Sequence, residues 1–211
     1  MYELLKRIID IVGALCGIIL FSPFLISGAI LVKVVSPEGP ILADIPSRVG
    51  KNKKPFKLLK FRSMIPNAQQ FLLENPEWHK KYVANNYKID AKEDPRLLPG
   101  ARFMRKYSID EMPQVFNVLR GEMSIVGPRP YYFFEVEEQC ERFPEAKLYM
   151  DRALSVKPGL TGPWQVGGRS DIPFVERVKM DSSYASRRSI LYDLLIVLKT
   201  PYVVISGKGA Y

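Results

Sequence analysis

The feature that most constrains how this chain folds is the uncharged run from residue 11 to residue 32, IVGALCGIILFSPFLISGAILV. A run of this length is long enough for an α-helix to cross the hydrocarbon core of a bilayer. A core helix of a soluble protein is rarely apolar on every face for so long. A secretory signal peptide would have a shorter apolar core and a small-residue cleavage site, and neither is evident. The run therefore predicts a membrane helix.

Ser22-Pro23 lies at the midpoint of this run and leaves two topologies open. Proline removes an amide donor and crowds the preceding turn, so we expect a kink or break, with Ser22 able to partner a freed carbonyl. One topology is a kinked single span; the other is a re-entrant helix-break-helix that leaves on the side where it entered. Lys6 and Arg7 precede the run and many basic residues follow it. Basic flanks at both ends favour the re-entrant path, with the following domain in the cytoplasm.

The rest of the 211 residues are enough for one domain with a hydrophobic core. The chain carries 31 Lys and Arg against 22 Asp and Glu, a net charge of +9, which suggests an anionic partner. The two cysteines lie far apart, so we expect no disulfide and a reducing compartment. The single histidine argues against His-based metal sites and against Ser–His or Cys–His triads.

The run KPFKLLKFRSM reads as a strand, with Phe56, Leu58, Lys60 and Arg62 on one face. Lys60 thus either snorkels at an edge of the sheet or reaches an anion in a pocket. The polar stretch from 66 to 96 reads as mainly helical, and MSIVGPRP as a short strand.

Asp110 and Glu111 are adjacent carboxylates in SIDEMPQ, and they carry two interpretations. Ser108 and Glu111 fit a capping box, and an acidic first turn suits the positive end of a helix. Alternatively, the two carboxylates are catalytic, because the basic residues Arg105 and Arg129 precede and follow them. Carboxylates beside several fixed cations suit phosphoryl transfer with a divalent metal. The two interpretations are compatible.

Three later segments contain further candidate binding or structural residues. In GPRP the two prolines clamp Arg129, which predicts either a rigid turn with a solvated side chain or a preorganised phosphate fork. VKPGLTGPWQVGGRSD is rich in glycine and could bring backbone amides close to a ligand. The tail from 189 to 211 predicts an apolar helix interrupted at Pro201, either in the core or along the membrane surface. Asp193 within it should have a partner.

Several of these motifs occur in the order found in the monotopic phosphoglycosyl transferases, the bacterial sugar transferases, and the chain resembles that family along essentially its whole length. The motifs are KRIID before the apolar run, SP at its midpoint, PFKLLKFRSM, DPRLLPGARFMRKYSIDEMPQVFNVLRGEMSIVGPRP, KPGLTGPWQVGGR and DSSYASRRSILYDLLIVLKT. Residues 65–96 most resemble the catalytic domain of the larger hexose 1-phosphate transferases. That likeness suggests a hexose.

The resemblance implies an α/β fold: a small mixed α/β cytoplasmic domain with interfacial amphipathic helices. Residues 1–36 would be a re-entrant membrane helix broken at Ser22-Pro23, and residues 37–211 the membrane-associated catalytic domain. The protein would sit in the bacterial cytoplasmic (inner) membrane, with that domain on the cytoplasmic face.

The resemblance further implies transfer of a sugar 1-phosphate from a UDP-sugar to undecaprenyl phosphate, with release of UMP. This would be the first membrane step of bacterial exopolysaccharide, O-antigen or glycoprotein glycan assembly. Asp110 would be the nucleophile that forms a phosphosugar-aspartyl intermediate, and Glu111 would help to hold Mg²⁺ with it or handle the acceptor. Carried over with them are the phosphate-binding residues Lys60, Arg105 and Arg129, the supporting acids Asp181 and Asp193, and the nucleotide-sugar loop residues Gly159, Gly162, Gln165 and Arg169.

The expected partners are therefore the sugar nucleotide, the lipid phosphate, membrane lipids and, as a further candidate, a second copy of the chain. Two other functions remain open: a metal-dependent hydrolase of sugar nucleotides, and a non-enzymatic anchor that binds anionic lipid. A nucleic-acid partner is not expected, because no basic motif interleaved with aromatic residues is evident. Gly167 departs from the polar or small residue common in the family, which leaves contacts at that point open.

Overall fold

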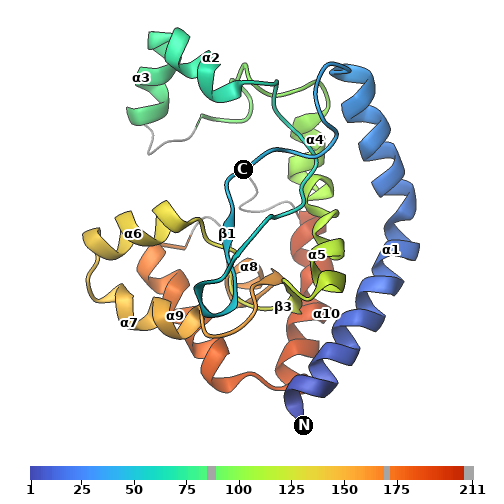
Figure 1. Cartoon of the computed structure of the whole chain (residues 1–211), viewed down its shortest axis with the longest axis vertical. Coiled ribbons are helices and arrows are strands. Elements are labelled where there is room, and N and C mark those ends of the chain that lie inside the picture. Colours follow the sequence, from blue (N-terminus) through green and yellow to red (C-terminus); the bar gives the residue numbers. More distant parts are fainter. Residues whose placement is uncertain (85–88, 169–171, 207–211) are drawn as a thin grey trace.

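In this computed structural model, residues 1–84, 89–168 and 172–206 are described, and helices dominate them (Figure 1). The α-helices described there are α1 (Tyr2–Val35), α2 (Ala68–Glu74), α3 (Pro76–Ala84), α4 (Ala101–Lys106), α5 (Gln114–Arg120), α6 (Phe133–Arg142), α7 (Ala146–Ala153), α8 (Pro163–Gly167), α9 (Phe174–Arg187) and α10 (Ile190–Ser206). The 3₁₀ turns are η1 (Lys51–Lys53) and η2 (Ile109–Glu111), and the strands are β1 (Arg48–Val49), β2 (Pro55–Phe56), β3 (Ser124–Val126) and β4 (Gly159–Thr161).

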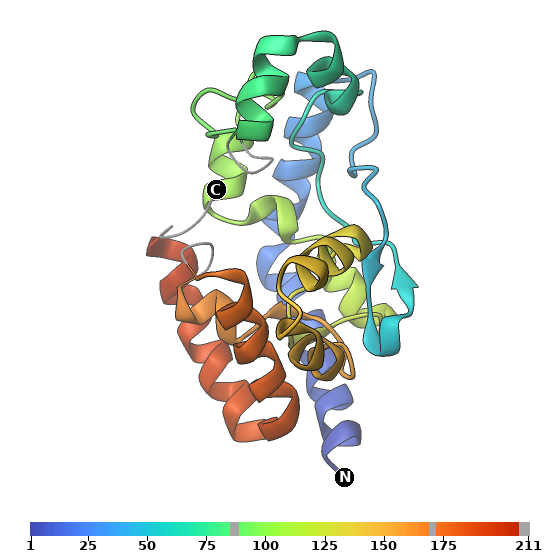
Figure 2. The same cartoon turned by 90° about the vertical axis from the view of Figure 1, so that its left-hand side faces the viewer.

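The strands form two small sheets in the middle of the molecule. β1 pairs antiparallel with β2, and β3 pairs in parallel with β4. A parallel pair needs a long crossover, which α6 and α7 supply. The helices α1, α4, α5 and α10 lie on one side of the strands, and α6, α7 and α9 on the other (Figure 1). In the view of Figure 2, α2 and α3 lie at the end of the molecule opposite the N-terminus. The predicted mixed α/β class is confirmed.

Helix α1 runs without interruption through Ser22-Pro23 and bows along one side of the molecule (Figure 1). Pro23 has no N–H for the carbonyl of Ile19, and the Ser22 hydroxyl donates to that carbonyl instead at 2.9 Å. The predicted serine compensation is confirmed. The expected division into two helices is absent, because this local bond satisfies the freed carbonyl and the helix continues. The re-entrant path stays a prediction.

Polar contacts fix the N-terminal half of α1 to the domain. Asp10 is buried, and its carboxylate accepts hydrogen bonds from the Ser124 hydroxyl at 2.8 Å and from the Ile125 amide at 2.9 Å. Arg7 donates to the carbonyls of Val118 and Leu119, the last turn of α5. The last carbonyls of a helix have no partner within it, and Arg7 satisfies two of those at the end of α5.

The C-terminal half of α1 packs through small and branched side chains. Val32 lies in one apolar cluster with Phe61 and Ile109. Gly28 faces the ring of Phe61 so closely that a Cβ would lie 2.8 Å from it. Most other large side chains of α1 are exposed. In length and composition α1 could cross a membrane, and it is the one such helix among the described residues.

Several local expectations prove wrong or need refinement. Ser108 does not cap a helix: it adopts a left-handed conformation with φ of 56°, and its side chain makes no capping bond. Pro201 does not interrupt α10, which continues to Ser206. One face of α10 is in the core, at Ile196, and the other exposes leucines. The core alternative is thus confirmed for one face, and contact of the other face with a membrane surface stays a prediction. Cys16 and Cys140 are free, as expected.

The predicted strand at KPFKLLKFRSM is paired as β2 only at Pro55–Phe56. Beyond that, the chain stays extended but finds separate partners. The amide of Leu59 donates to the Asn117 side chain at 2.9 Å, and the amide of Phe61 to the Asp110 carbonyl at 2.8 Å. Residues 60–62 also form a short antiparallel bridge with residues 41–43, where the Ala43 amide donates to the Lys60 carbonyl at 2.8 Å and the Arg62 amide to the Ile41 carbonyl at 2.9 Å. Alternation alone predicted one continuous ladder and does not reveal that the partner changes along the segment. The polar stretch from 66 to 96 contains α2 and α3, and residues 85–88 of it lie outside the described part.

We predict that Gly28→Ala lowers the thermal unfolding midpoint of the detergent-purified protein, because the added methyl group meets the buried ring of Phe61. Overpacking of this kind costs about 1–3 kcal/mol, partly offset by up to ~1 kcal/mol of helix propensity. The expected fall is roughly 2–6 °C.

Gly17→Ala on the same helix is the matched control. Its Cβ would lie an ordinary 3.7 Å from Val115, so the midpoint should stay or rise slightly. Equal behaviour of the two variants would contradict the packing assigned to Gly28.

Candidate active site

Lys60 and Asp110 meet at the centre of the predicted site. The Lys60 ammonium lies 2.8 Å from Asp110 Oδ2 and 3.4 Å from Glu111 Oε1. The backbone bond from the Phe61 amide to the Asp110 carbonyl holds the two segments in this register. The Lys60 ammonium therefore lies at the two carboxylates and not at a solvent-facing edge, and its contact with a phosphate stays a prediction. Asp110 is 1% exposed, whereas the Glu111 side chain keeps 48% of its surface exposed.

The fold delivers Asp110 through a sharp turn. Ser108, in its left-handed conformation, redirects the chain between α4 and η2. Ile109 then turns into the apolar cluster with Val32 of α1, and Asp110 points toward Lys60. The pair is thus placed directly against the long apolar helix.

The charges around Lys60 and Glu111 favour the ionised forms of these two side chains. Burial lowers the pKa of the Lys60 ammonium, but the attraction of Asp110 and Glu111 outweighs it and raises that pKa overall. Partial loss of hydration inside the cleft raises the pKa of Glu111, while Lys60, Arg129 and Arg48 bring it below its usual value. Three cations therefore act on this one exposed carboxylate.

Arg105 comes from α4, one turn before the pair. Its Nε and Nη2 donate to the Ser63 hydroxyl at 3.1 and 3.0 Å. Burial lowers the pKa of Arg105, opposed by the attraction of Asp110 and Asp94. Arg105 is thus held by a neutral hydroxyl and attracted by the charge of Asp110. Its remaining guanidinium N–H groups are available for an anion.

Arg129 follows β3 in the clamped GPRP turn. Its amide donates to Asp181 Oδ2 at 3.1 Å, and its Nε lies 3.9 Å from Glu135 Oε1. Its side chain is 31% exposed and lines the same cleft as Lys60 and Glu111. The Arg129 side chain therefore faces the cleft, and its role as a phosphate fork stays a prediction.

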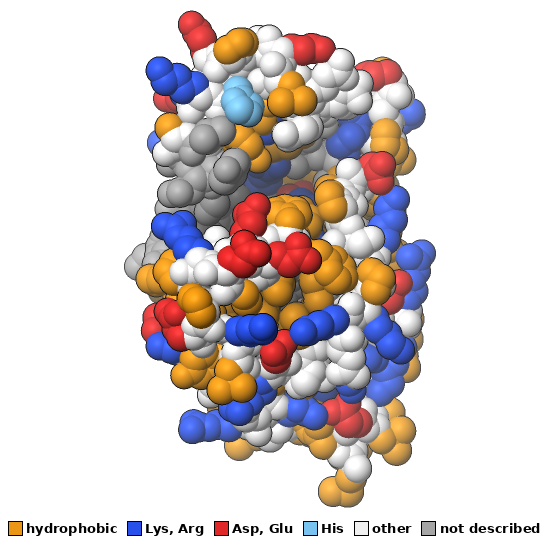
Figure 3. Space-filling view, turned by 60° about the vertical axis from the view of Figure 1, so that its left-hand side comes forward, with side chains coloured by type: hydrophobic (Ala, Val, Ile, Leu, Met, Phe, Trp, Pro, Cys, Tyr) orange, Lys and Arg blue, Asp and Glu red, His pale blue; other side chains and the backbone are white. Residues whose placement is uncertain are grey.

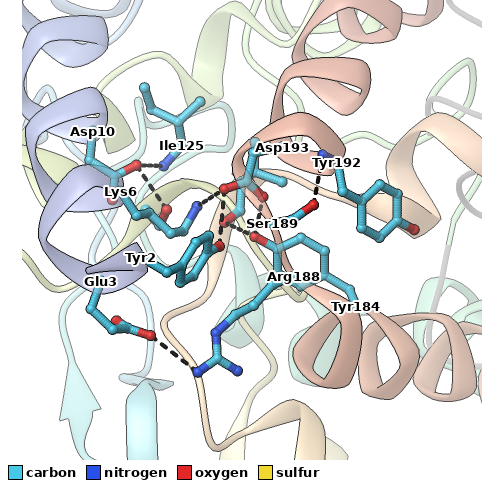
Figure 4. Close-up of polar contacts among 12 residues, drawn as sticks. Tyr2, Glu3, Lys6, Asp10, Ile125, Tyr184, Arg188, Ser189, Tyr192 and Asp193 are labelled. Carbon is cyan, nitrogen blue, oxygen red and sulfur yellow. Dashed lines mark hydrogen bonds and ion pairs between the residues drawn. The ribbon is translucent and has the colours of Figure 1, made fainter.

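The two remaining acids support the fold around the site. Asp181 is fully buried and also accepts from the Tyr131 hydroxyl at 2.9 Å. Asp193 accepts from Lys6 at 2.7 Å and from the hydroxyls of Tyr2 at 3.1 Å and Tyr184 at 2.6 Å (Figure 4). Its predicted need for a partner is confirmed: it ties the start of α1 to α9 and α10.

The glycines predicted to approach a ligand pack against backbone. A Cβ on Gly159 would lie 2.0 Å from the amide nitrogen of Gly127, and one on Gly162 would lie 2.0 Å from the Gly127 carbonyl oxygen. Both glycines therefore permit the close crossing of β3 and β4. Gln165 lies just beyond them on α8, Arg169 lies outside the described residues, and contact of this loop with a ligand stays a prediction.

Arg48 and Arg177 are cleft residues that the sequence did not single out. Arg48 is 8% exposed. Its guanidinium carbon lies 3.2 Å from the centroid of the Tyr132 ring, and the guanidinium donates to the Pro130 carbonyl at 3.0 Å. Burial lowers its pKa to about 10, so it stays charged at neutral pH. In the sequence, Arg48 counts only among the basic residues that follow the apolar run.

These residues surround an open cleft of about 1990 Å³. Figure 3 shows a hollow on this face, between the part formed by α2 and α3 and the part formed by α6, with acidic side chains gathered over α6. The lining is cationic near the pair and apolar toward α1 and α10, and its apolar members include Ala14, Leu25, Leu194 and Val197.

A metal would find two adjacent carboxylates here. Among the described residues no three His, Cys, Asp or Glu side chains converge, so an all-protein cage is not available in that part of the chain. Mg²⁺ often binds through one or two carboxylates together with substrate phosphates. Asp110 Oδ2 is engaged by Lys60, so Glu111 offers the freer oxygens. The donor set fits Mg²⁺ bound jointly with a diphosphate.

Comparison with known proteins gives consistent results. The model of the family described as "Bacterial sugar transferase" matches residues 1–207. An "Undecaprenyl-phosphate galactose phosphotransferase" of Salmonella typhimurium is 40% identical over 98% of this chain and 42% of that protein. A "UDP-glucose:undecaprenyl-phosphate glucose-1-phosphate transferase" of Escherichia coli is 38% identical over 99% and 42%. The "Exopolysaccharide production protein ExoY" of Rhizobium meliloti is 37% identical over 98% and 88%. The chain thus spans less than half of the first two relatives.

We predict that Asp181 makes the protein less stable as pH rises from about 4 to 7. Burial raises its pKa from the usual 3.8 to about 7, against hydrogen bonds from Arg129 and Tyr131. In that window the folded state binds more protons than the unfolded state, so the free energy of unfolding falls with pH. The effect reaches up to ~4 kcal/mol. Chemical unfolding in detergent at pH 4.5 and 7.5 measures it.

Asp181→Asn mimics the neutral acid and should flatten this dependence relative to the wild type. Asp44→Asn, at an exposed position, should leave the slope unchanged. If the free energy of unfolding of Asp181→Asn fell with pH as steeply as that of the wild type, Asp181 would not be the source of the pH dependence.

Proposed function

We propose that this chain, which belongs to the bacterial sugar transferase family, is a phosphoglycosyl transferase that moves a sugar 1-phosphate from a UDP-sugar to undecaprenyl phosphate and releases UMP. The observation that carries the proposal is the buried Asp110 carboxylate, paired with Lys60 at 2.8 Å in a cationic cleft beside α1. The relatives' names, which mention galactose and glucose, support a hexose. ExoY's name supports a role in exopolysaccharide assembly.

In the first step an Asp110 carboxylate oxygen attacks the phosphorus next to the sugar. A bond forms between that oxygen and phosphorus, and the bond to the bridging oxygen breaks, so that UMP leaves with the electron pair. Lys60, at 2.8 Å, orients the carboxylate. Arg105 and Arg129 stabilise the charge on the phosphoryl oxygens, because guanidinium groups match phosphate geometry.

In the second step an oxygen of the lipid phosphate attacks the same phosphorus, and the Asp110 carboxylate is released. Dividing the reaction lets a water-soluble donor and a membrane acceptor use one residue in turn. With 1% exposure, Asp110 is shielded from water, which disfavours loss of the intermediate by hydrolysis.

Magnesium, when bound, would neutralise charge on the diphosphate. Glu111 would hold it together with Asp110, and the 48% exposure of Glu111 leaves room for water and phosphate oxygens.

The same proposal includes a re-entrant α1 in the bacterial cytoplasmic membrane, with the catalytic domain on the cytoplasmic face. Lys6 and Arg7 before the apolar run and Lys33 at its end support cytoplasmic placement of both ends. The interfacial elements would be the apolar faces of α10 and α4. They expose Leu191, Leu194, Leu198, Tyr202 and Phe103.

The reaction is tested by measuring UMP release and lipid-linked product with Mg²⁺, undecaprenyl phosphate and a panel of UDP-hexoses. We expect both products from one donor in equal amounts. Asp110→Asn should lose at least ~10³-fold in rate, which corresponds to about 4 kcal/mol of barrier, because the amide cannot form the intermediate.

Asp44→Asn, the exposed control, should stay within about twofold of the wild type. UMP release that continues without lipid over many turnovers would instead indicate a hydrolase. No release with any donor would favour the lipid-binding anchor.

The topology is tested by cysteine labelling in a variant lacking Cys16 and Cys140. Leu4→Cys and Asp44→Cys place thiols at exposed positions before and after the apolar run. A membrane-impermeant maleimide should label neither in intact spheroplasts and both after lysis. Labelling of one of the two in intact spheroplasts would show a single span.

A further inference from the structure

The apolar part of the cleft lies between α1 and α10, and we call it the α1–α10 groove. Lining residues of α1 recur at every fourth position: Gly13, Gly17, Phe21 and Leu25. Lining residues of α10 recur at every third or fourth position: Ile190, Leu194, Val197 and Pro201. Residues at this spacing share one face of a helix. Each helix therefore presents one apolar stripe to the cleft.

Two sets of contacts fix the walls of the groove. At the start of both helices, Lys6 donates to Asp193 at 2.7 Å, and the Tyr2 hydroxyl donates to the same carboxylate at 3.1 Å (Figure 4). Farther along α1, Gly17 faces Val115 of α5, which lies 3.7 Å from the position that a Cβ would occupy. The α1 wall thus rests on the domain, and the buried Asp193 carboxylate holds the α10 wall to it.

Large apolar side chains of the groove are uncovered in the described part of the chain. Phe21 is 42% exposed, Leu194 52% and Val197 38%. Apolar surface that is continuous and uncovered usually contacts a partner. A polar ligand would lose hydration here without compensation, because the two stripes offer no hydrogen-bonding side chain. The groove therefore fits an apolar partner.

The groove continues into the part of the cleft that contains the carboxylate pair. Lys60, Arg105 and Arg129 line the same cleft and place three cations beyond its apolar part. A partner that fits both parts has a phosphate at one end and an apolar chain at the other. The cations match the charge of the phosphate, and the two stripes match the chain. A nucleotide sugar has no apolar chain, so the donor does not fit the groove.

We propose that the α1–α10 groove binds the first isoprene units of the acceptor lipid, while the lipid phosphate lies at the carboxylate pair. Leu194 and Val197 then contact the chain directly. Leu191 and Leu198, each 67% exposed, lie on the outer face of α10, away from the cleft. The inference rests on the proposed function, because the occupant is the acceptor of that reaction.

The groove should act on the second step of the reaction alone. A reaction through a covalent intermediate has two steps that can be measured separately. The kcat/KM of the UDP-sugar reports formation of the intermediate, and the kcat/KM of the lipid phosphate reports transfer from it. A change in the groove should therefore alter the second value and leave the first as it is, whereas a change at Asp110 alters both.

The first test is Val197→Trp, which fills the groove with an indole ring and keeps α10 apolar. We expect the kcat/KM of undecaprenyl phosphate to fall at least about tenfold, the effect of losing contact with roughly two methylene groups. The kcat/KM of the UDP-sugar should stay within about twofold of the wild type. Leu198→Trp is the matched control, because it adds the same ring to the outer face, and both values should stay within about twofold. Thermal unfolding midpoints check that both variants are folded.

The second test needs no catalysis. The full chain in detergent, without UDP-sugar, is irradiated with a farnesyl phosphate that carries a diazirine on its chain, and labelled peptides are mapped by mass spectrometry. We expect labels within residues 13–25 and 190–204, reduced by excess undecaprenyl phosphate and by Val197→Trp. Phosphatidylglycerol in the same excess is the control for general lipid contact and should leave the labels in place.

An unchanged kcat/KM of undecaprenyl phosphate in Val197→Trp, an equal fall in Leu198→Trp, or a matching fall for the UDP-sugar would each overturn the inference. Equal competition by phosphatidylglycerol would also overturn it and make the groove a general lipid contact. Labelling of the groove in a protein that transfers nothing to lipid would contradict the proposed function alone. Transfer to lipid with the labels on other segments would contradict the groove alone.

Discussion

The hydrogen bond from the Phe61 amide to the Asp110 carbonyl, at 2.8 Å, is the constraint on which the rest of the site depends. It joins two segments far apart in sequence and sets the adjoining Lys60 ammonium 2.8 Å from the Asp110 carboxylate. An ion pair so buried is stable only when geometry is good and neighbouring polar groups are satisfied. The backbone bond supplies that geometry, and the side chains of Phe61 and Ile109 fix it by packing on α1.

Helix α1 is therefore both an apolar surface and a structural support for the reacting groups. Its first half is held by the polar contacts of Asp10 and Arg7, and its second half by contact of Gly28 and Val32 with the residues beside the pair. A change in how α1 lies should thus reach Asp110 through two packed side chains. Under the proposed function, in which the acceptor is a membrane lipid phosphate, this coupling would let the helix that contacts the membrane also position the Asp110 carboxylate.

The sequence predicted those parts of the fold and site that follow from local pattern. The length of the apolar run and the strand before Arg129 follow from periodicity. The position of the Lys60 side chain does not, because alternation left it open between an edge of the sheet and a pocket. The conformation of Ser108 was not predictable, because a capping box and a left-handed turn have the same residues and tertiary packing decides between them. Arg48 escaped notice because its cleft position depends on Tyr132, which approaches it from a distant segment. Pro23 failed to break α1 because a single serine bond satisfied the freed carbonyl.

The central claim is that Asp110 carries the sugar phosphate between donor and acceptor. It is tested most directly by intact-protein mass spectrometry of the chain mixed with Mg²⁺ and its UDP-sugar, with no lipid present. The account predicts one added sugar phosphate per chain, mapped to the peptide containing Asp110 and lost when undecaprenyl phosphate is added. Lipid-linked product formed while no adduct accumulates, even under rapid quenching, or an adduct on another residue, would contradict it.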